Sequence, residues 1–249
     1  MISISLCMIV KNEELALGRC LDSVKNLMDE IIIVDTGSTD KTKEIASLYT
    51  NKIYDFSWIN DFAAARNFSF SKATKDYIMW LDADDVLLYE DNKKLQQLKE
   101  NLDTSVDMVI MRYNMSFDKD DKPIYSFNRE RLLKRSCNYT WSGQVHETID
   151  YFGNIIYSSI GVSHKKIKET PIDRNLKIYE YILSQGKKLQ PREEFYYGRE
   201  LMYNNRFDDA IEVLTSFINS SFGFVENKIS ACKDLAFCYF SQNKNLEGL

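Results

Sequence analysis

The chain has 249 residues with a formal net charge of −5, 44% hydrophobic and 28% charged, which is the balance of an ordinary globular protein with a sizeable core. This length fits one large domain or a medium domain with an appendage. The acidic charge and the lack of a long basic run argue against a nucleic acid partner, because phosphate binding usually needs a basic face.

The apolar segment at residues 1–10 is too short to span a bilayer and has no basic stretch before it. We therefore expect no transmembrane segment and a cytoplasmic protein. Five cysteines without a CxxC pair predict reduced, mostly buried thiols. With only His146 and His164, an enzyme that binds zinc through several histidines is excluded.

The first part of the chain alternates between strand and helix patterns. Strands are expected at 2–10, 30–34, 53–56 and 77–81, and helices at 12–28, 38–48 and 61–73. Asn12 and either Ser38 or Thr39 are the expected caps of the first two helices, with Leu15 and Leu48 facing the core. This rhythm predicts right-handed βαβ units in an open sheet, which binds ligands at the carboxyl ends of its strands.

The pattern changes after a charged helix at about 90–102. Extended segments are expected at 106–117, 123–133, 139–149 and 154–162. The polar turn 118–122 joins the first two of them into a hairpin. These segments form the antiparallel half of the α/β domain.

From Asp173 onward the pattern is helical and contains an internal repeat. Residues 204–211 are echoed by 242–249, and Gly198 corresponds to Ala236, the small residue where two helices would cross tightly. This arrangement is similar to tetratricopeptide repeats. The second copy stops within its second helix, so we expect the repeat arm to be truncated.

The fold class expected from these patterns is α/β, a Rossmann-like mixed sheet followed by an all-α helical-repeat segment. The sheet domain is expected at 1–170 and the helical arm at 171–249.

Three carboxylates, those of Asp82, Asp84 and Asp85, follow the apolar strand at 77–81. Their mutual repulsion would be costly without a cation. In an extended segment the side chains of Asp82 and Asp84 could point the same way. Mg²⁺ or Mn²⁺ suits such oxygen ligands and would bridge to a diphosphate. The alternative is a solvated acidic turn that caps the next helix.

Four motifs at strand ends make the chain resemble the family 2 glycosyltransferases of GT-A fold. They are Asn12-Glu13, Val34-Asp35-Thr36-Gly37-Ser38-Thr39-Asp40, Ala65-Arg66-Asn67 and Trp80-Leu81-Asp82-Ala83-Asp84-Asp85. They occur in the family's order over about the first ninety residues. The resemblance implies an inverting sugar transfer from a nucleotide diphosphate donor, most commonly UDP, with Mn²⁺ or Mg²⁺.

The resemblance also implies roles for single residues on the donor side. Asp35 would hold the nucleotide base beside Asn12 and Glu13, Asp82 would contact the ribose, and Asp84 would ligate the metal. Arg66 would offer a forked donor to the nucleotide or phosphate. Without such neighbours, an arginine on a helix is usually a surface ion-pair partner.

On the acceptor side, Trp141-Ser142-Gly143-Gln144-Val145-His146-Glu147 looks like the Gly-Arg-Val-His-Glu segment of glycosyltransferases that carry helical repeats. An inverting transfer needs a base for the acceptor's proton. Glu147 is the first candidate, His146 the second and Asp150 a third. His164, after the last expected strand, stands where related enzymes often place a third metal ligand, although a lone histidine is slightly more often structural.

Other functions fit these residues less well. Asp35-Thr36-Gly37-Ser38 matches the aspartic protease signature, but those enzymes need a second such aspartate and none occurs. Sugar nucleotidyltransferases normally carry a glycine-rich loop where this chain has 11–14. An inactive protein that binds a sugar nucleotide or a peptide is the remaining alternative. The helical arm favours a protein or peptide acceptor over a glycan, and it could also mediate oligomerisation.

Overall fold

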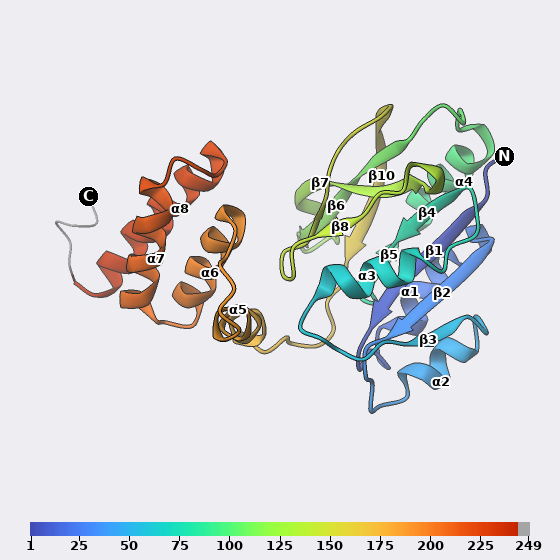
Figure 1. The fold of residues 1–249 in the computed structure, drawn as a ribbon. Coiled ribbons are helices and arrows are strands. Elements are labelled where there is room, and N and C mark those ends of the chain that lie inside the picture. The colour runs from blue at the N-terminus through green and yellow to red at the C-terminus, as the bar shows by residue number, and fades with distance from the viewer. Residues whose placement is uncertain (244–249) are drawn as a thin grey trace. The chain divides into compact units, whose positions relative to one another are not determined.

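The computed structural model describes residues 1–243, which form two compact units (Figure 1). The sheet unit comprises Met1–Ser142 and Glu147–Glu169. The helical unit comprises Gly143–His146 and the described residues from Thr170 onward. No helix among the described residues is long and apolar enough to cross a membrane.

The sheet unit is built on eight strands in the order β3-β2-β1-β4-β7-β6-β10-β5. The strands are β1 (Ile4–Val10), β2 (Glu30–Asp35), β3 (Ile53–Asp55), β4 (Tyr77–Trp80), β5 (Asp85–Leu87), β6 (Met108–Phe117), β7 (Pro123–Lys134) and β10 (Ile155–His164). Strands β1 to β4 are parallel, β7 is antiparallel to both β4 and β6, and β10 is parallel to β6. The carboxyl ends of β1, β2, β3, β4, β6 and β10 therefore lie on one side of the sheet, which we call the carboxyl edge.

Helices cover both faces of this sheet (Figure 1). They are α1 (Leu17–Val24), α2 (Thr42–Ser47), α3 (Phe62–Phe70) and α4 (Tyr89–Asn101), with 3₁₀ turns at Lys25–Leu27 and Arg135–Cys137. One apolar core joins α1, α2 and α4 to the sheet. A second core on the other face joins α3 to the sheet and to the small hairpin of β8 (Trp141–Ser142) and β9 (Thr148–Ile149). Because both faces are covered, every residue of β2 is buried, as its unbroken apolar run requires.

The expected mixed α/β sheet followed by a helical segment is confirmed, but the first two helix starts were wrong. Helix α1 begins after Ala16 and not at Asn12, and α2 begins after Lys41; neither has a side-chain cap. The polar residues at 12 and 38–39 instead bind the loops after β1 and β2 to each other. The two leucines expected in the core, Leu15 and Leu48, are 71% and 80% exposed.

Two further differences concern the strands. The expected extended segment 139–149 is only two short strands around a turn, in which Gly143 and His146 have φ values of 90° and 53°. Strand β5, directly after the acidic turn, was not expected; it pairs with the end of β10. Tertiary pairing, and not local propensity, makes this three-residue segment a strand.

The helical unit contains α5 (Arg174–Ser184), α6 (Pro191–Tyr203), α7 (Phe207–Asn219) and α8 (Val225–Ser241). A Cβ atom at Gly198 of α6 would lie 2.6 Å from Cδ2 of Leu214 of α7, so the crossing of these helices requires a small residue, as expected. The predicted second helix of the second repeat, at 244–249, lies outside the described residues.

Candidate functional site

Asp35 ends strand β2 at the carboxyl edge and is 2% exposed. Its Oδ1 accepts hydrogen bonds from the backbone N–H groups of Gly37, at 2.9 Å, and Ser38, at 2.8 Å. This turn has φ of +104° at Gly37, a conformation that favours glycine. The other carboxylate oxygen, Oδ2, is buried and has no partner in the described part of the chain. A buried acceptor left in this state is a natural place for a ligand N–H.

Asn12 and Glu13, the residues expected near the base, belong to the loop after β1. Asn12 Oδ1 accepts from the backbone N–H of Thr39 at 2.7 Å. The Glu13 carboxylate is 2.6 Å from Nζ of Lys168, which also donates to the Asn12 carbonyl. Burial raises the pKa of Glu13, and the nearby Lys168 only partly offsets it. Both side chains are thus already engaged in shaping the loop.

Arg66, on α3, binds two of the predicted site residues at once. Its Nη2 donates to Asp82 at 2.8 Å and its Nε donates to Glu147 at 2.6 Å. The guanidinium lies 4.9 Å from the ring centroids of both Trp80 and Trp141. Burial disfavours the charged form of Asp82, but attraction by Arg66 outweighs it and lowers the pKa to about 2. The Arg66 cluster, as we call Arg66, Asp82 and Glu147, therefore joins one cation to two carboxylates, and Arg131 and Arg129 add further positive charge near Asp82.

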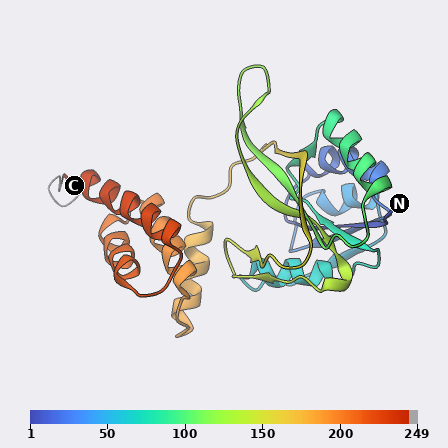
Figure 2. The same ribbon diagram turned by 90° about the horizontal axis from the view of Figure 1, so that it is seen from above.

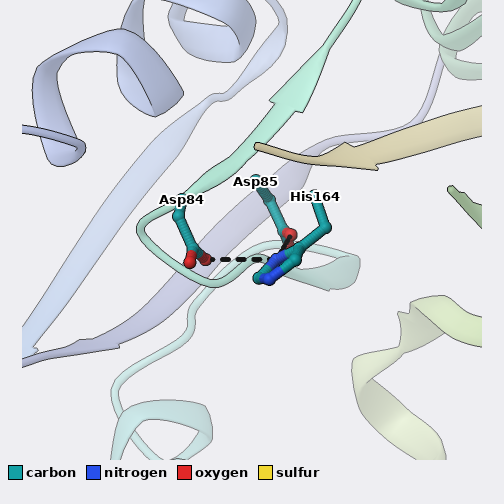
Figure 3. Close-up of side chains that lie close together, drawn as sticks. All are labelled: Asp84, Asp85 and His164. Atoms are coloured by element: carbon teal, nitrogen blue, oxygen red, sulfur yellow. Dashed lines mark ion pairs between the residues drawn. The ribbon is translucent and has the colours of Figure 1, made fainter. Parts of the chain in front are cut away.

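Asp84, Asp85 and His164 form a second group, with ligand atoms within 4.8 Å of one another (Figure 3). Nδ1 of His164, at the end of β10, is 3.4 Å from Asp84 and 3.5 Å from Asp85. Asp85 is fully buried and accepts hydrogen bonds from Arg131 at 3.0 Å and Tyr113 at 2.9 Å. Burial and the neighbouring carboxylates raise the pKa of Asp84, despite the attraction of His164. Two carboxylates and an imidazole at this spacing fit Mn²⁺ or Mg²⁺.

Asp82 and Asp84, expected to point the same way, thus serve different groups. The chain turns after β4, and the Asp85 backbone N–H donates to the Asp82 carbonyl. An extended segment at 82–84 was therefore the wrong assumption. The turn sends Asp82 to Arg66 and Asp84 to His164.

Arg131 and Tyr113, which support Asp85, were missed by the sequence analysis. Arg131 is fully buried, and its guanidinium lies 3.8 Å from the ring centroid of Trp80 and 4.4 Å from that of Tyr113. The available signal was an arginine directly before the apolar pair 132–133 in an expected strand. A charge at a core position requires a buried partner, because desolvation is costly.

His146, the second candidate base, lies in the part of the chain that clusters with the helical unit. Its Nε2 is 2.9 Å from Glu200, and its ring stacks on Tyr196 at 4.1 Å. Asp150, the third candidate, is exposed after β9. Of the three candidates, only Glu147 is bound to a residue of the donor side.

Comparison with known proteins agrees with this architecture. The family model for glycosyl transferase family 2 matches residues 5–157, and the chain belongs to that family. An uncharacterized glycosyltransferase of Rickettsia typhi is 35% identical over 247 residues, which cover 92% of this chain and 82% of that protein. The glycosyltransferase SunS from the SPbeta prophage of Bacillus subtilis is 29% identical over 226 residues, or 85% of this chain and 52% of SunS.

Two further comparisons concern the share of its relatives that the chain covers and its fold. A TPR repeat-containing protein of Synechococcus elongatus is 49% identical over 150 residues, 60% of this chain and 36% of that protein. The chain thus spans about a third to a half of the length of the Synechococcus and Bacillus relatives. The crystal structure of S. aureus TarS in complex with UDP has a TM-score of 0.51 at 13% identity, covering 99% of this chain and 88% of that one. This likeness confirms the expected GT-A-like fold.

Proposed function

We propose that the chain is a metal-dependent, inverting transferase that moves a sugar from a UDP-sugar to a polypeptide or glycan acceptor. The observation that carries the proposal is the meeting of Asp84 and His164 at the carboxyl edge. The sheet unit would be the transferase domain, and the helical unit would be an arm of tetratricopeptide type. The TarS complex with UDP and the glycosyltransferase names of the relatives support the donor class.

On the donor side, three aspartates would divide the work. Asp35 Oδ2, which has no hydrogen-bond partner among residues 1–243, would accept an N–H of the nucleotide base. Asp82, held by Arg66, would contact the ribose. Asp84 and His164 would hold Mn²⁺ or Mg²⁺, with Asp85 fixing the turn beside them. The bound cation would supply positive charge against the departing diphosphate.

On the acceptor side, Glu147 remains the proposed base. The transfer needs a group that takes the acceptor's proton, and among the three candidates it is Glu147 whose carboxylate pairs with Arg66 of the donor side. His146 is less suited because its imidazole is bound to Glu200. Glu147→Gln should therefore lower kcat far more than it changes the affinity for UDP.

Calorimetric titration of UDP, with Mn²⁺ and then with EDTA, tests the donor site. Wild type should bind UDP only with metal, and Asp84→Asn should lose at least about 100-fold in this affinity, because a ligand oxygen of the cation is replaced. Asp150→Asn, an exposed carboxylate of the same unit, is the matched control and should bind as wild type. Failure of UDP and of other nucleotides to bind with metal would overturn the proposal. Binding without any hydrolysis or transfer of the sugar would leave the inactive binding protein as the function.

A further inference from the structure

The β6–β7 hairpin extends beyond the rest of the sheet, as Figure 2 shows. It leaves the sheet at the carboxyl edge, where β6 ends. Pairing of β10 with β6 stops at Asn114, so in the described part of the chain the outer part of the hairpin consists of its own two strands. All residues from Pro123 to Asn128 are exposed. The hairpin thus presents a strand to the solvent beside the proposed metal site.

A row of aromatic rings leads along this hairpin away from the metal site. The hydroxyl of Tyr113 is 3.0 Å from Nδ1 of His164. The ring of Phe127 lies 5.5 Å from that of Tyr113, and the ring of Tyr125 lies 6.2 Å from that of Phe127. Tyr125 and Phe127 are 59% and 39% exposed. Apolar rings that cluster on a surface usually mark a binding site. The row is continuous with the group that would hold the donor's diphosphate.

The same hairpin carries a free strand edge. Strand β7 pairs with β4 only at Leu132–Lys134, so within residues 1–243 the outer edge of 123–129 has no strand partner. An extended polypeptide can pair with such an edge through its backbone, and every second side chain then lies on the same face. On the face of Tyr125 and Phe127, these side chains would meet the aromatic rings. A glycan could stack on the rings but would leave the backbone edge unused.

We propose that the free edge of β7 at 123–129, together with Tyr125 and Phe127, is the docking site of the acceptor, and that the acceptor is an extended polypeptide with apolar residues at alternate positions. The inference rests on the proposed function, and it selects a polypeptide from the two acceptor classes named there. The acceptor pairs with the edge as an added strand, and the aromatic row leads from it through Tyr113 to the proposed metal site at His164.

The test uses a library of random decapeptides, with the enriched peptides remade and labelled for fluorescence anisotropy. Wild type should bind them, and the double variant Tyr125→Ser with Phe127→Ser should bind at least about 10-fold more weakly. Tyr125→Ser alone should weaken binding by less. Tyr89→Ser, which removes an exposed aromatic ring from α4, is the matched control and should not change the affinity. N-methylation of the peptide should weaken binding at alternate residues only, since a strand pairs with its neighbour at every second residue.

Several outcomes would overturn the inference. They are the absence of any bound peptide, binding that ignores the hairpin variants, and uniform tolerance of N-methylation. Sedimentation that shows wild type pairing with a second copy, lost in the double variant, would assign the edge to self-association instead. The double variant should still bind UDP with Mn²⁺ as wild type does. If neither wild type nor any variant bound UDP with Mn²⁺, the result would instead contradict the proposed function.

Discussion

Strand β2 begins and ends with a buried carboxylate, and the two are treated in opposite ways. At its amino end, Glu30 accepts hydrogen bonds from Ser5, from Lys52 and from both the backbone and the hydroxyl of Thr74. At its carboxyl end, Asp35 has one oxygen bound to its own turn and one without a partner among the described residues. Glu30 thus stabilises the fold through its hydrogen bonds, whereas the unpartnered oxygen of Asp35 is where we propose that a ligand N–H binds.

The same contrast divides the acidic turn after β4. Asp82 is compensated within the Arg66 cluster, and its pKa is lowered to about 2. Burial and its acidic neighbours raise the pKa of Asp84, although His164 and a backbone hydrogen bond favour its ionised form. Asp82 is thus already stabilised by neighbouring guanidinium groups, whereas an added cation would stabilise the ionised form of Asp84. The predictions below test this division.

The largest effect on the free energy of unfolding is expected when Arg66 is removed from the Arg66 cluster. Arg66→Met would remove the ion-pair partner that the partly buried carboxylates of Asp82 and Glu147 share, and should lower the free energy of unfolding by about 3–5 kcal/mol. Urea denaturation measures this. Lys43→Met, which removes an exposed ion pair with Asp55, is the control and should leave the urea midpoint close to that of wild type. Similar losses in both variants would mean that Arg66 stabilises the fold no more than an exposed ion pair does.

Acid should weaken the amino end of β2. Burial opposes ionisation of Glu30, but its hydrogen bonds with Lys52, Ser5 and Thr74 outweigh this and lower the pKa from 4.5 to about 2. A lowered folded-state pKa means that the stabilisation is complete above the unfolded value and is lost as the pH falls through the folded one. The loss between about pH 5 and pH 2 should approach roughly 3 kcal/mol. Urea unfolding of wild type and Glu30→Gln across this range isolates it, and parallel curves would refute the assignment.

At the other end of the same strand, Asp35→Asn should affect the ligand and not the fold. Its remaining oxygen can still accept from Gly37 and Ser38, so the free energy of unfolding should change by less than about 1 kcal/mol. Affinity for UDP should fall roughly 30-fold, the value of one hydrogen bond to a charged acceptor. Calorimetry and urea denaturation on one preparation give both numbers. A large loss of stability with unchanged UDP affinity would reverse the roles of Glu30 and Asp35.

The smallest effect is expected at Glu13, whose carboxylate forms an ion pair with the half-exposed Lys168. Lys168→Met removes a partner that is 45% exposed, so it should cost less than about 1 kcal/mol of stability. The loop at Lys11 and Asn12 loses its contacts with the lysine, and UDP should bind about 2- to 3-fold more weakly. A loss as large as that of Asp35→Asn would place Glu13 or its loop in direct contact with the nucleotide.

Much of this fold could be predicted because its signals are local and periodic. The apolar run at β2 and the turn at 118–122 allowed strands to be placed within a few residues. The starts of α1 and α2 could not, since Asn12 and Ser38 look like helix caps yet bind each other's loops. Sequence spacing cannot show that a polar side chain prefers a distant partner.

The site was predictable to a similar extent. A motif identified Asp84 as a candidate and the place of His164 after the last expected strand identified the histidine; the fold brings the two within 3.4 Å although they come from distant parts of the chain. The joining of Arg66 to both Asp82 and Glu147 was not predictable, because it depends on how α3 packs against the β8–β9 hairpin. The buried support from Arg131 also depends on tertiary packing.

The order in which the ligand groups occur along the chain has a consequence for its synthesis. Asp35 and Asp84 are made early, whereas His164 ends the last strand of the sheet. A nascent chain that has not yet reached β10 carries the acidic turn without its imidazole. Under the proposed function, such an unfinished chain would have Asp35 for the nucleotide base but would lack one ligand of the cation. Donor cleavage would then begin only after the whole sheet had been made.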